Sequence, residues 1–180
     1  MKTFANLVIA LAIIFTPLCG TAEITVQDEA FMRECFALAR YAMQRGDDPF
    51  GAVLVKDGKI IMRATNSVHT EDDTLRHAET NLIGKARRIL GKEAITGSTL
   101  YSSCEPCSMC CGAINLGDGI ITGLVYGLPA QRLVDLVGSG KAMSSKAYFE
   151  WVGNDIEVRG PVLETEAEEV ILDYLDLAGK

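Results

Sequence analysis

The first apolar pattern along the chain has a helical period. Thr25 and Asp28 have the spacing of a capping box, in which two side chains satisfy free amides at a helix start. A Gly-Asp-Asp-Pro run at residues 46–49 would stop a helix. Between these signals, apolar side chains recur every three or four residues, at Phe31, Cys35, Leu38 and Ala42. The pattern predicts one helix over about residues 25–45, with this stripe in the core.

The pattern then changes to short apolar runs bounded by turn residues. Residues 51–55 are continuously apolar, and the Asp57-Gly58 pair before residues 60–62 predicts a β-hairpin. Thr165 and Glu168 again have capping-box spacing and predict the start of a last amphipathic helix. Further strands are expected at residues 99–103, 120–127 and 156–158, and further helices at 77–90, 107–116 and 129–137. A strand, a helix and a strand joined by short connections predict parallel pairing.

Composition suits one globular domain with a sizeable core, since 48% of the 180 residues are hydrophobic. The formal net charge is −7 at pH 7, and no Lys/Arg-rich arm or cluster is visible in the sequence. An acidic surface repels phosphate backbones, so a small substrate is favoured and nucleic acid is not expected as a partner.

Residues 1–22 have the pattern of a secretory leader, with Lys2, an apolar run over residues 7–15 and small residues up to Ala22. The run is short for a membrane span, so no stable span is expected after cleavage. The predicted organisation is a signal peptide at 1–22 and one domain at 23–180. Export would place the domain in the periplasm or outside the cell. An uncleaved anchor, lipidation at Cys19 or a mispredicted start codon stay open, and the last would leave it cytoplasmic.

Two short motifs suggest one metal site. Cys107 and Cys110 are three residues apart after Pro106, which favours a first helical turn that presents both sulfurs on one face. His77 and Glu79 lie about 200° apart around a helix, so they can serve one site only beyond its N-terminus. Two helix starts aimed at one point favour thiolates and suit a bound anion.

The ligand count indicates catalytic zinc. His77, Cys107 and Cys110 are three ligands, which leaves the fourth tetrahedral position for water. Such water loses its proton near neutral pH, and Glu79 is the candidate acid and base that would accept this proton.

The His77-x-Glu79 and Pro106-Cys107-x-x-Cys110 motifs are a known signature of zinc base deaminases. The sequence resembles the cytidine and deoxycytidylate deaminase superfamily over about residues 28–128, especially its guanine deaminase and tRNA adenosine deaminase branches. The resemblance implies a three-layer α/β/α fold with a mixed sheet of about five strands, and a homodimer or larger assembly. It also implies hydrolytic deamination of a nucleobase or nucleoside.

The resemblance extends to candidate substrate residues. Asn66 follows the second expected strand, where these families place an asparagine that binds the base or sugar. Turn formation is its ordinary alternative. Glu105 would line the pocket or be a buried carboxylate that organises loops. Tyr148, Phe149 and Trp151 form an aromatic cluster that would either pack in the core or stack on the base.

Other interpretations of the cysteines stay open. Cys104 could be a fourth ligand, which would close a structural zinc site or form part of an iron-sulfur site. The protein would then be a noncatalytic zinc-stabilised binding domain, a second hypothesis beside the deaminase and its tRNA adenosine variant. The cysteines could also be buried or redox-active residues. Cys35, Cys104 and Cys111 are expected to be buried small hydrophobic residues rather than a disulfide framework.

Overall fold

The computed structural model describes residues 23–117, 119–138 and 140–179. Their five strands form one sheet in the order β2-β1-β3-β4-β5. β1 pairs antiparallel with β2 and β3, whereas β3, β4 and β5 are parallel. The strands are β1 (Gly51–Lys56), β2 (Lys59–Thr65), β3 (Ser98–Cys104), β4 (Ile121–Leu128) and β5 (Glu157–Arg159). The predicted mixed sheet and the parallel pairing around the β3–β4 crossover are confirmed.

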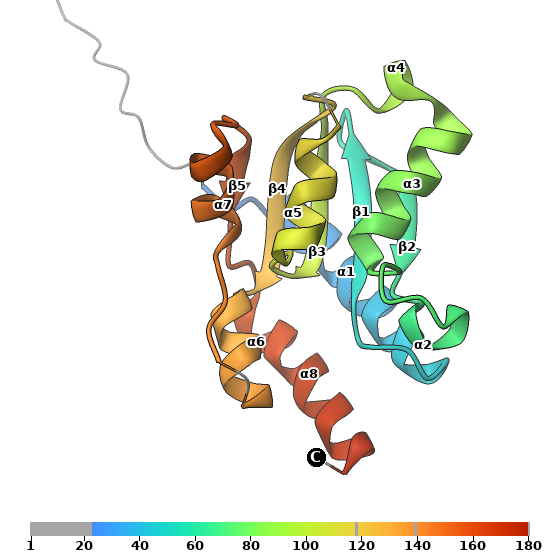
Figure 1. The fold of residues 1–180 in the computed structure, drawn as a ribbon, viewed down its shortest axis with the longest axis vertical. Coiled ribbons are helices and arrows are strands. Elements are labelled where there is room, and N and C mark those ends of the chain that lie inside the picture. The colour runs from blue at the N-terminus through green and yellow to red at the C-terminus, as the bar shows by residue number, and fades with distance from the viewer. Residues whose placement is uncertain (1–22, 118, 139, 180) are drawn as a thin grey trace, which may run out of the picture.

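Helices cover both faces of this sheet, so the domain has three layers (Figure 1). Helices α1 and α8 pack on one face, and α3, α5 and α7 pack on the other. The helices are α1 (Val26–Gln44), α2 (Val68–Glu71), α3 (Ala78–Leu90), α4 (Lys92–Ile95), α5 (Ser108–Asn115), α6 (Ala130–Val137), α7 (Ser145–Val152) and α8 (Glu164–Ala178).

Strand alternation divides the core into two parts. Val53 and Val55 face α1 and α8, whereas Leu54 faces α3. All three side chains are buried, which explains why the sequence shows a continuous apolar run instead of an alternating one. The strand that carries these side chains is a central strand, with neighbours on both sides.

The first helix and the hairpin form as their local signals predict. Thr25 and Asp28 make the reciprocal hydrogen bonds of a capping box at the start of α1. Between β1 and β2, Asp57 and Gly58 both have positive φ angles, of 50° and 70°. This is the backbone twist that suits a two-residue hairpin turn.

The predicted capping box at the last helix is wrong. Helix α8 begins at Glu164, after Leu163 with φ of 54°, and no side chain caps it. Thr165 therefore lies inside the first turn. Glu168 instead accepts two hydrogen bonds from Arg132 of α6, a tertiary contact that outweighs the local pattern.

The aromatic residues of the cluster all lie on α7, a helix that the sequence pattern did not predict, and they differ in burial. Phe149 is buried in the core, and Tyr148 packs against it edge to face. Trp151 is 79% exposed. The core interpretation is therefore confirmed for Phe149 and wrong for Trp151.

The expected leader at residues 1–22 lies outside the described residues. Among the residues that are described, no helix is both long enough and apolar enough to cross a membrane.

Candidate metal centre

Two helix starts meet at the site. His77 is the N-cap residue of α3, and Cys107 is the N-cap residue of α5. Both residues have extended backbones, with ψ angles of 156° and 169°, so each side chain lies at the mouth of its helix. The prediction that the site lies beyond a helix N-terminus is confirmed for these two residues.

The three predicted ligands have the separations of a tetrahedral zinc site. Cys107 Sγ lies 3.7 Å from Cys110 Sγ and 3.8 Å from His77 Nδ1, and the Cys110–His77 distance is 3.6 Å. Zn–S bonds of about 2.3 Å and a Zn–N bond of about 2.0–2.1 Å would place tetrahedral donors about 3.6–3.8 Å apart. One nitrogen and two sulfurs are also a donor set that zinc prefers. The residues present therefore fit zinc.

A fourth protein ligand is not among the described residues of this group, which comprises His77, Cys107 and Cys110. Cys104 belongs to the core cluster on the α1 face of the sheet, and its thiol is buried. Its sulfur is not among the three donor atoms, from His77, Cys107 and Cys110, that lie within 4.8 Å of one another. The interpretation of Cys104 as a closing ligand is therefore wrong. Cys35 and Cys111 are likewise free and buried, as expected.

The site is buried on one side and open on the other. Cys110 is fully buried, whereas Cys107 is exposed. The pKa of the Cys107 thiol is lowered to about 4, because hydrogen bonds from Cys110 and His77 outweigh its partial burial. Cys107 is therefore a thiolate at neutral pH, the form that binds metal. A fourth position on the exposed side could be reached by water or a substrate.

Glu79 points into this site from the first turn of α3. Its side chain is buried, and its Oε2 lies 3.4 Å from Cys110 Sγ. Burial raises the pKa of the carboxyl above its usual value. A carboxyl group with a raised pKa beside three metal ligands can accept and return a proton, as the sequence predicted.

Ser102 supports Glu79 and was missed by the sequence analysis. The Ser102 hydroxyl donates a 2.9 Å hydrogen bond to Glu79 Oε1, and Ser102 is fully buried. This bond fixes the direction of the carboxylate. Strand alternation carried a signal, because Ser102 shares a face of β3 with Leu100, which packs under α3. A buried polar side chain on that face needs a partner.

Asn66 lies at the edge of the same region. Its neighbour Ser67 donates a backbone hydrogen bond to the carbonyl of Arg76, directly before His77. The Asn66 side chain is buried, and its Oδ1 accepts from the Val68 amide. Its Nδ2 has no hydrogen-bond partner within the described chain. A buried donor without a partner is costly, and a substrate acceptor would satisfy it. Substrate binding by Asn66 stays a prediction.

The Glu105 carboxylate holds two neighbouring helices in place. Oε2 accepts from the amide of Ala130 at 2.9 Å, and Oε1 accepts from the amide of Ser145 at 2.7 Å. These residues stand at the starts of α6 and α7. The contacts are those of a buried carboxylate that organises loops, the alternative considered for this residue. A role of its backbone in substrate binding stays a prediction.

The other histidine is not part of the metal group. His69 Nε2 lies 3.1 Å from Asp48 Oδ1, and more than half of the His69 side chain is exposed. His69 belongs to the short helix α2 and faces solvent.

A sheet edge with two helix starts, three metal ligands and a buried carboxyl group defines a zinc hydrolase site of the base-deaminase class. Residues 25–127 match the family model described as the cytidine and deoxycytidylate deaminase zinc-binding region. The chain therefore belongs to this family.

Curated relatives with different substrates are similar to this chain. The tRNA-specific adenosine deaminase of Bacillus subtilis is 46% identical over 90 residues, 50% of this chain and 56% of that protein. The guanine deaminase of Bacillus subtilis is 46% identical over 87 residues, 48% of this chain and 56% of that protein. The probable cytosine deaminase of Schizosaccharomyces pombe is 35% identical over 157 residues, 82% of this chain and 92% of that protein. The matches thus span just over half the length of the two bacterial relatives.

A solved structure agrees with the architecture. It comes from a study of A-to-I editing by tRNA:A34 deaminases and is 33% identical, with a TM-score of 0.65. The match covers 78% of this chain and 98% of that one. The predicted deaminase-like fold is confirmed.

Proposed function

We propose that this protein is a zinc-dependent hydrolase that removes the exocyclic amino group of a nucleobase or nucleoside as ammonia. One observation carries the proposal. Glu79, a buried carboxyl residue, lies 3.4 Å from one sulfur of a three-ligand group whose spacing suits zinc. A purely structural zinc site would need a fourth protein donor and would not explain a carboxyl group kept out of water.

The chain supplies the proton transfers and the orientation. Zinc bound by His77, Cys107 and Cys110 would lower the pKa of a water in the fourth position to about 7. Glu79 takes a proton from the attacking water as the new C–O bond forms at the amino-bearing carbon. The electron pair of the ring C=N bond moves to the ring nitrogen, which receives that proton from Glu79. Glu79 then accepts the second proton of the water and passes it to the amino group as the C–N bond breaks.

Two side chains hold the reacting groups in place. Ser102 fixes one oxygen of the Glu79 carboxylate through its 2.9 Å hydrogen bond, which leaves the other oxygen directed at the metal ligands. The unpaired Nδ2 of Asn66 can donate to a ring nitrogen or carbonyl of the substrate. A substrate that satisfies this amide gains orientation, because the amide has no competing partner in the described chain.

The decisive experiment combines metal analysis with an ammonia-release screen over bases, nucleosides and nucleotides. The wild-type protein is expected to hold one zinc per chain and to release ammonia from at least one compound. Glu79→Gln is expected to keep zinc and lose about 10²- to 10⁴-fold in kcat, the usual contribution of general acid–base catalysis. Full turnover in zinc-loaded Glu79→Ala would refute the mechanism. Ammonia from no compound would favour the noncatalytic zinc-stabilised binding domain.

A small substrate is favoured over nucleic acid by the pairing of the arginines near the site. Arg76, directly before His77, forms ion pairs with Glu71 and Asp73. Arg45 likewise pairs with Asp47. Cations already paired with acids offer little to a phosphate backbone, in a chain of formal net charge −7.

A tRNA adenosine deaminase activity is the second candidate. The 46% identity to a tRNA-specific adenosine deaminase over 90 residues favours it. A stem-loop RNA with adenosine at the wobble position should therefore be included in the screen. Inosine in the RNA, with no ammonia from free bases or nucleosides, would select this candidate.

We also propose that the chain forms a homodimer or larger assembly. Leu75 and Leu116 are 60% and 80% exposed and line one groove between α3 and α5. Apolar side chains gathered beside a groove suit contact with a second copy. Light scattering of the purified protein should give at least twice the chain mass.

Export from the cytoplasm is proposed from the leader pattern alone. N-terminal mass measurement of the protein from its native host is expected to show a chain that begins at Glu23. A mature chain that begins at Met1 would refute cleavage.

A further inference from the structure

One edge of the sheet carries both the metal site and a second feature, an apolar pocket. At this edge β1 begins, while β2, β3 and β4 end. Asn66 follows β2, the Cys107 motif follows β3, and α6 follows β4. In Figure 1, α6 and α8 lie together at this edge, beyond the ends of the strands.

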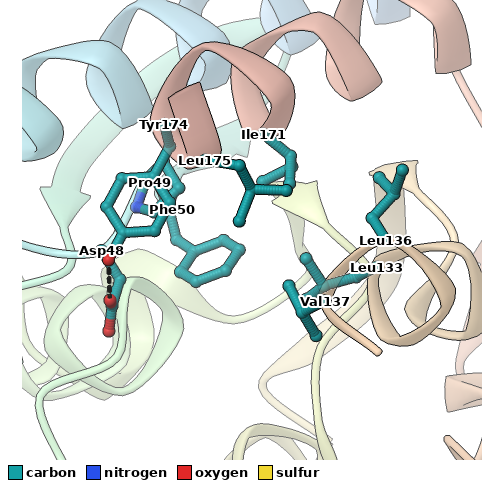
Figure 2. Close-up of a pocket in the computed structure, with 9 residues that line it drawn as sticks. All are labelled: Asp48, Pro49, Phe50, Leu133, Leu136, Val137, Ile171, Tyr174 and Leu175. Carbon is teal, nitrogen blue, oxygen red and sulfur yellow. Dashed lines mark hydrogen bonds between the residues drawn. The ribbon is translucent and has the colours of Figure 1, made fainter. Parts of the chain in front are cut away.

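The pocket lies between α6, α8 and the loop that leads into β1, as Figure 2 shows. Its volume is about 460 Å³, within the range of small-molecule sites. Apart from Asp48, every side chain of the lining is apolar or aromatic. The lining consists of Asp48, Pro49 and Phe50 from the loop, Leu133, Leu136 and Val137 from α6, and Ile171, Tyr174 and Leu175 from α8.

Two walls of the pocket are hydrogen-bonded to the candidate substrate residues Asn66 and Glu105. The Phe50 carbonyl accepts a 2.9 Å hydrogen bond from the amide of Asn66, the candidate orienting residue. Helix α6 is held at Ala130 by Glu105, which lies two residues before the ligand Cys107. These two hydrogen bonds place the pocket next to the candidate substrate residues, at the same end of the strands as the metal group.

The charges around the pocket exclude a phosphate group. Its lining contains one acid and no cation. Asp48 Oδ1 already accepts a hydrogen bond from the Tyr174 hydroxyl at 3.1 Å. Arg132, the cation on α6, makes two hydrogen bonds with Glu168. His69 Nε2 lies 3.1 Å from Asp48 Oδ1, but His69 is outside the lining and carries a charge only when it is protonated. A phosphate placed here would lose water and face a carboxylate with no cation in the lining, whereas an apolar group would gain by leaving water.

We propose that this pocket binds an uncharged apolar substituent of the substrate, an alkyl or aryl group on the side of the ring away from the amino group. The preferred substrate is then a neutral amino-substituted heterocycle instead of a nucleoside phosphate. The inference rests on the proposed deaminase function and adds the substrate class to it.

Matched substrate series test the proposal. Ammonia release is measured for cytosine and guanine as free bases, with ethyl, butyl or benzyl on the nitrogen that normally carries ribose, as nucleosides, and as 5′-monophosphates. For the active ring, kcat/KM is expected to rise about threefold to fourfold per added methylene, the benefit of burying that surface. It is expected to be lowest for the monophosphate. Highest activity on the monophosphate, or no rise with alkyl length, would overturn the proposal.

A pair of lysine variants locates the effect in the pocket. Val137 lines the pocket and is 47% exposed, so Val137→Lys adds a cation at the rim without opening the core. The variant should lower the ratio of kcat/KM for the butyl compound to that for the free base about tenfold, and raise the ratio for the monophosphate. Leu177→Lys is the control, because Leu177 lies on α8, is 76% exposed and is not part of the lining. It should change neither ratio.

The outcomes distinguish a failure of the pocket assignment from a failure of the proposed deaminase function. Ammonia from the free base, with both ratios unchanged in Val137→Lys, overturns the pocket assignment and leaves the deaminase intact. Ammonia from no compound, with zinc bound, overturns the proposed function and this inference together.

Discussion

Glu105→Gln tests whether the buried Glu105 carboxylate holds the starts of α6 and α7 beside the loop that leads to Cys107. In the native protein its two oxygens each accept one backbone amide, from Ala130 and Ser145. A glutamine has one acceptor oxygen and one NH₂ group, so one of these amides would face a second donor at hydrogen-bond distance. Among the described residues, neither amide has a second acceptor that would replace the lost bond.

The structure sets the size of the effect. Hydrogen bonds to a charged group contribute about 1.5–3 kcal/mol each, and an unsatisfied buried donor costs about 1–3 kcal/mol. Glu105→Gln should therefore lower the free energy of unfolding by about 2–4 kcal/mol, a large part of the about 5–15 kcal/mol typical of a domain. The zinc ligands are untouched, so zinc stoichiometry should stay at one per chain.

Urea unfolding of the zinc-saturated protein, followed by circular dichroism, measures this loss. Glu150→Gln is the matched control, because Glu150 is an exposed carboxylate on α7, and its change should stay within about 0.5 kcal/mol. A loss below about 1 kcal/mol in Glu105→Gln, with native zinc content, would show that the carboxylate does not hold these helices in place.

Two further changes test the fold around the site. Burial raises the pKa of Asp28, but hydrogen bonds from Arg159, Tyr101 and Thr25 outweigh it and hold the pKa well below its usual range. A lowered folded-state pKa stabilises the protein above pH 4, and this stability is lost as pH falls below about 4. Asp28→Asn should thus lower the free energy of unfolding by about 3 kcal/mol at pH 7 and reduce the loss of stability at acid pH. Urea unfolding midpoints measured at pH 3–7 would show both effects. Equal pH slopes in the two proteins would contradict this. Gly51→Ala should lower the free energy of unfolding by about 1–3 kcal/mol, because the added Cβ would lie 2.5 Å from the Cys35 carbonyl oxygen. Gly84→Ala is the control and should not destabilise the protein, because its Cβ would face only the flexible Arg88 side chain. Similar melting temperatures for the two alanine variants would refute that packing argument.

Local sequence patterns determined the elements and the chemistry of this protein. The period of α1, the turn at Asp57-Gly58 and the ligand spacing of Cys107 and Cys110 act over a few residues, so they can be recognised without the fold. The same is true of His77 and Glu79, since helix geometry requires a site that both residues serve to lie beyond a helix start.

Tertiary packing determined which residues from different elements contact and support one another. Ser102 can hydrogen-bond Glu79 only because β3 runs beneath α3. Glu105 can accept backbone amides from two helices only because α6 and α7 both start beside it. The capping pattern at Thr165 failed for the same reason, because Arg132 of α6 hydrogen-bonds the Glu168 carboxylate of α8. The apolar pocket unites residues more than a hundred positions apart, from Asp48 to Leu175. Such contacts depend on which faces the sheet brings together, and short-range periodicity holds no information about them.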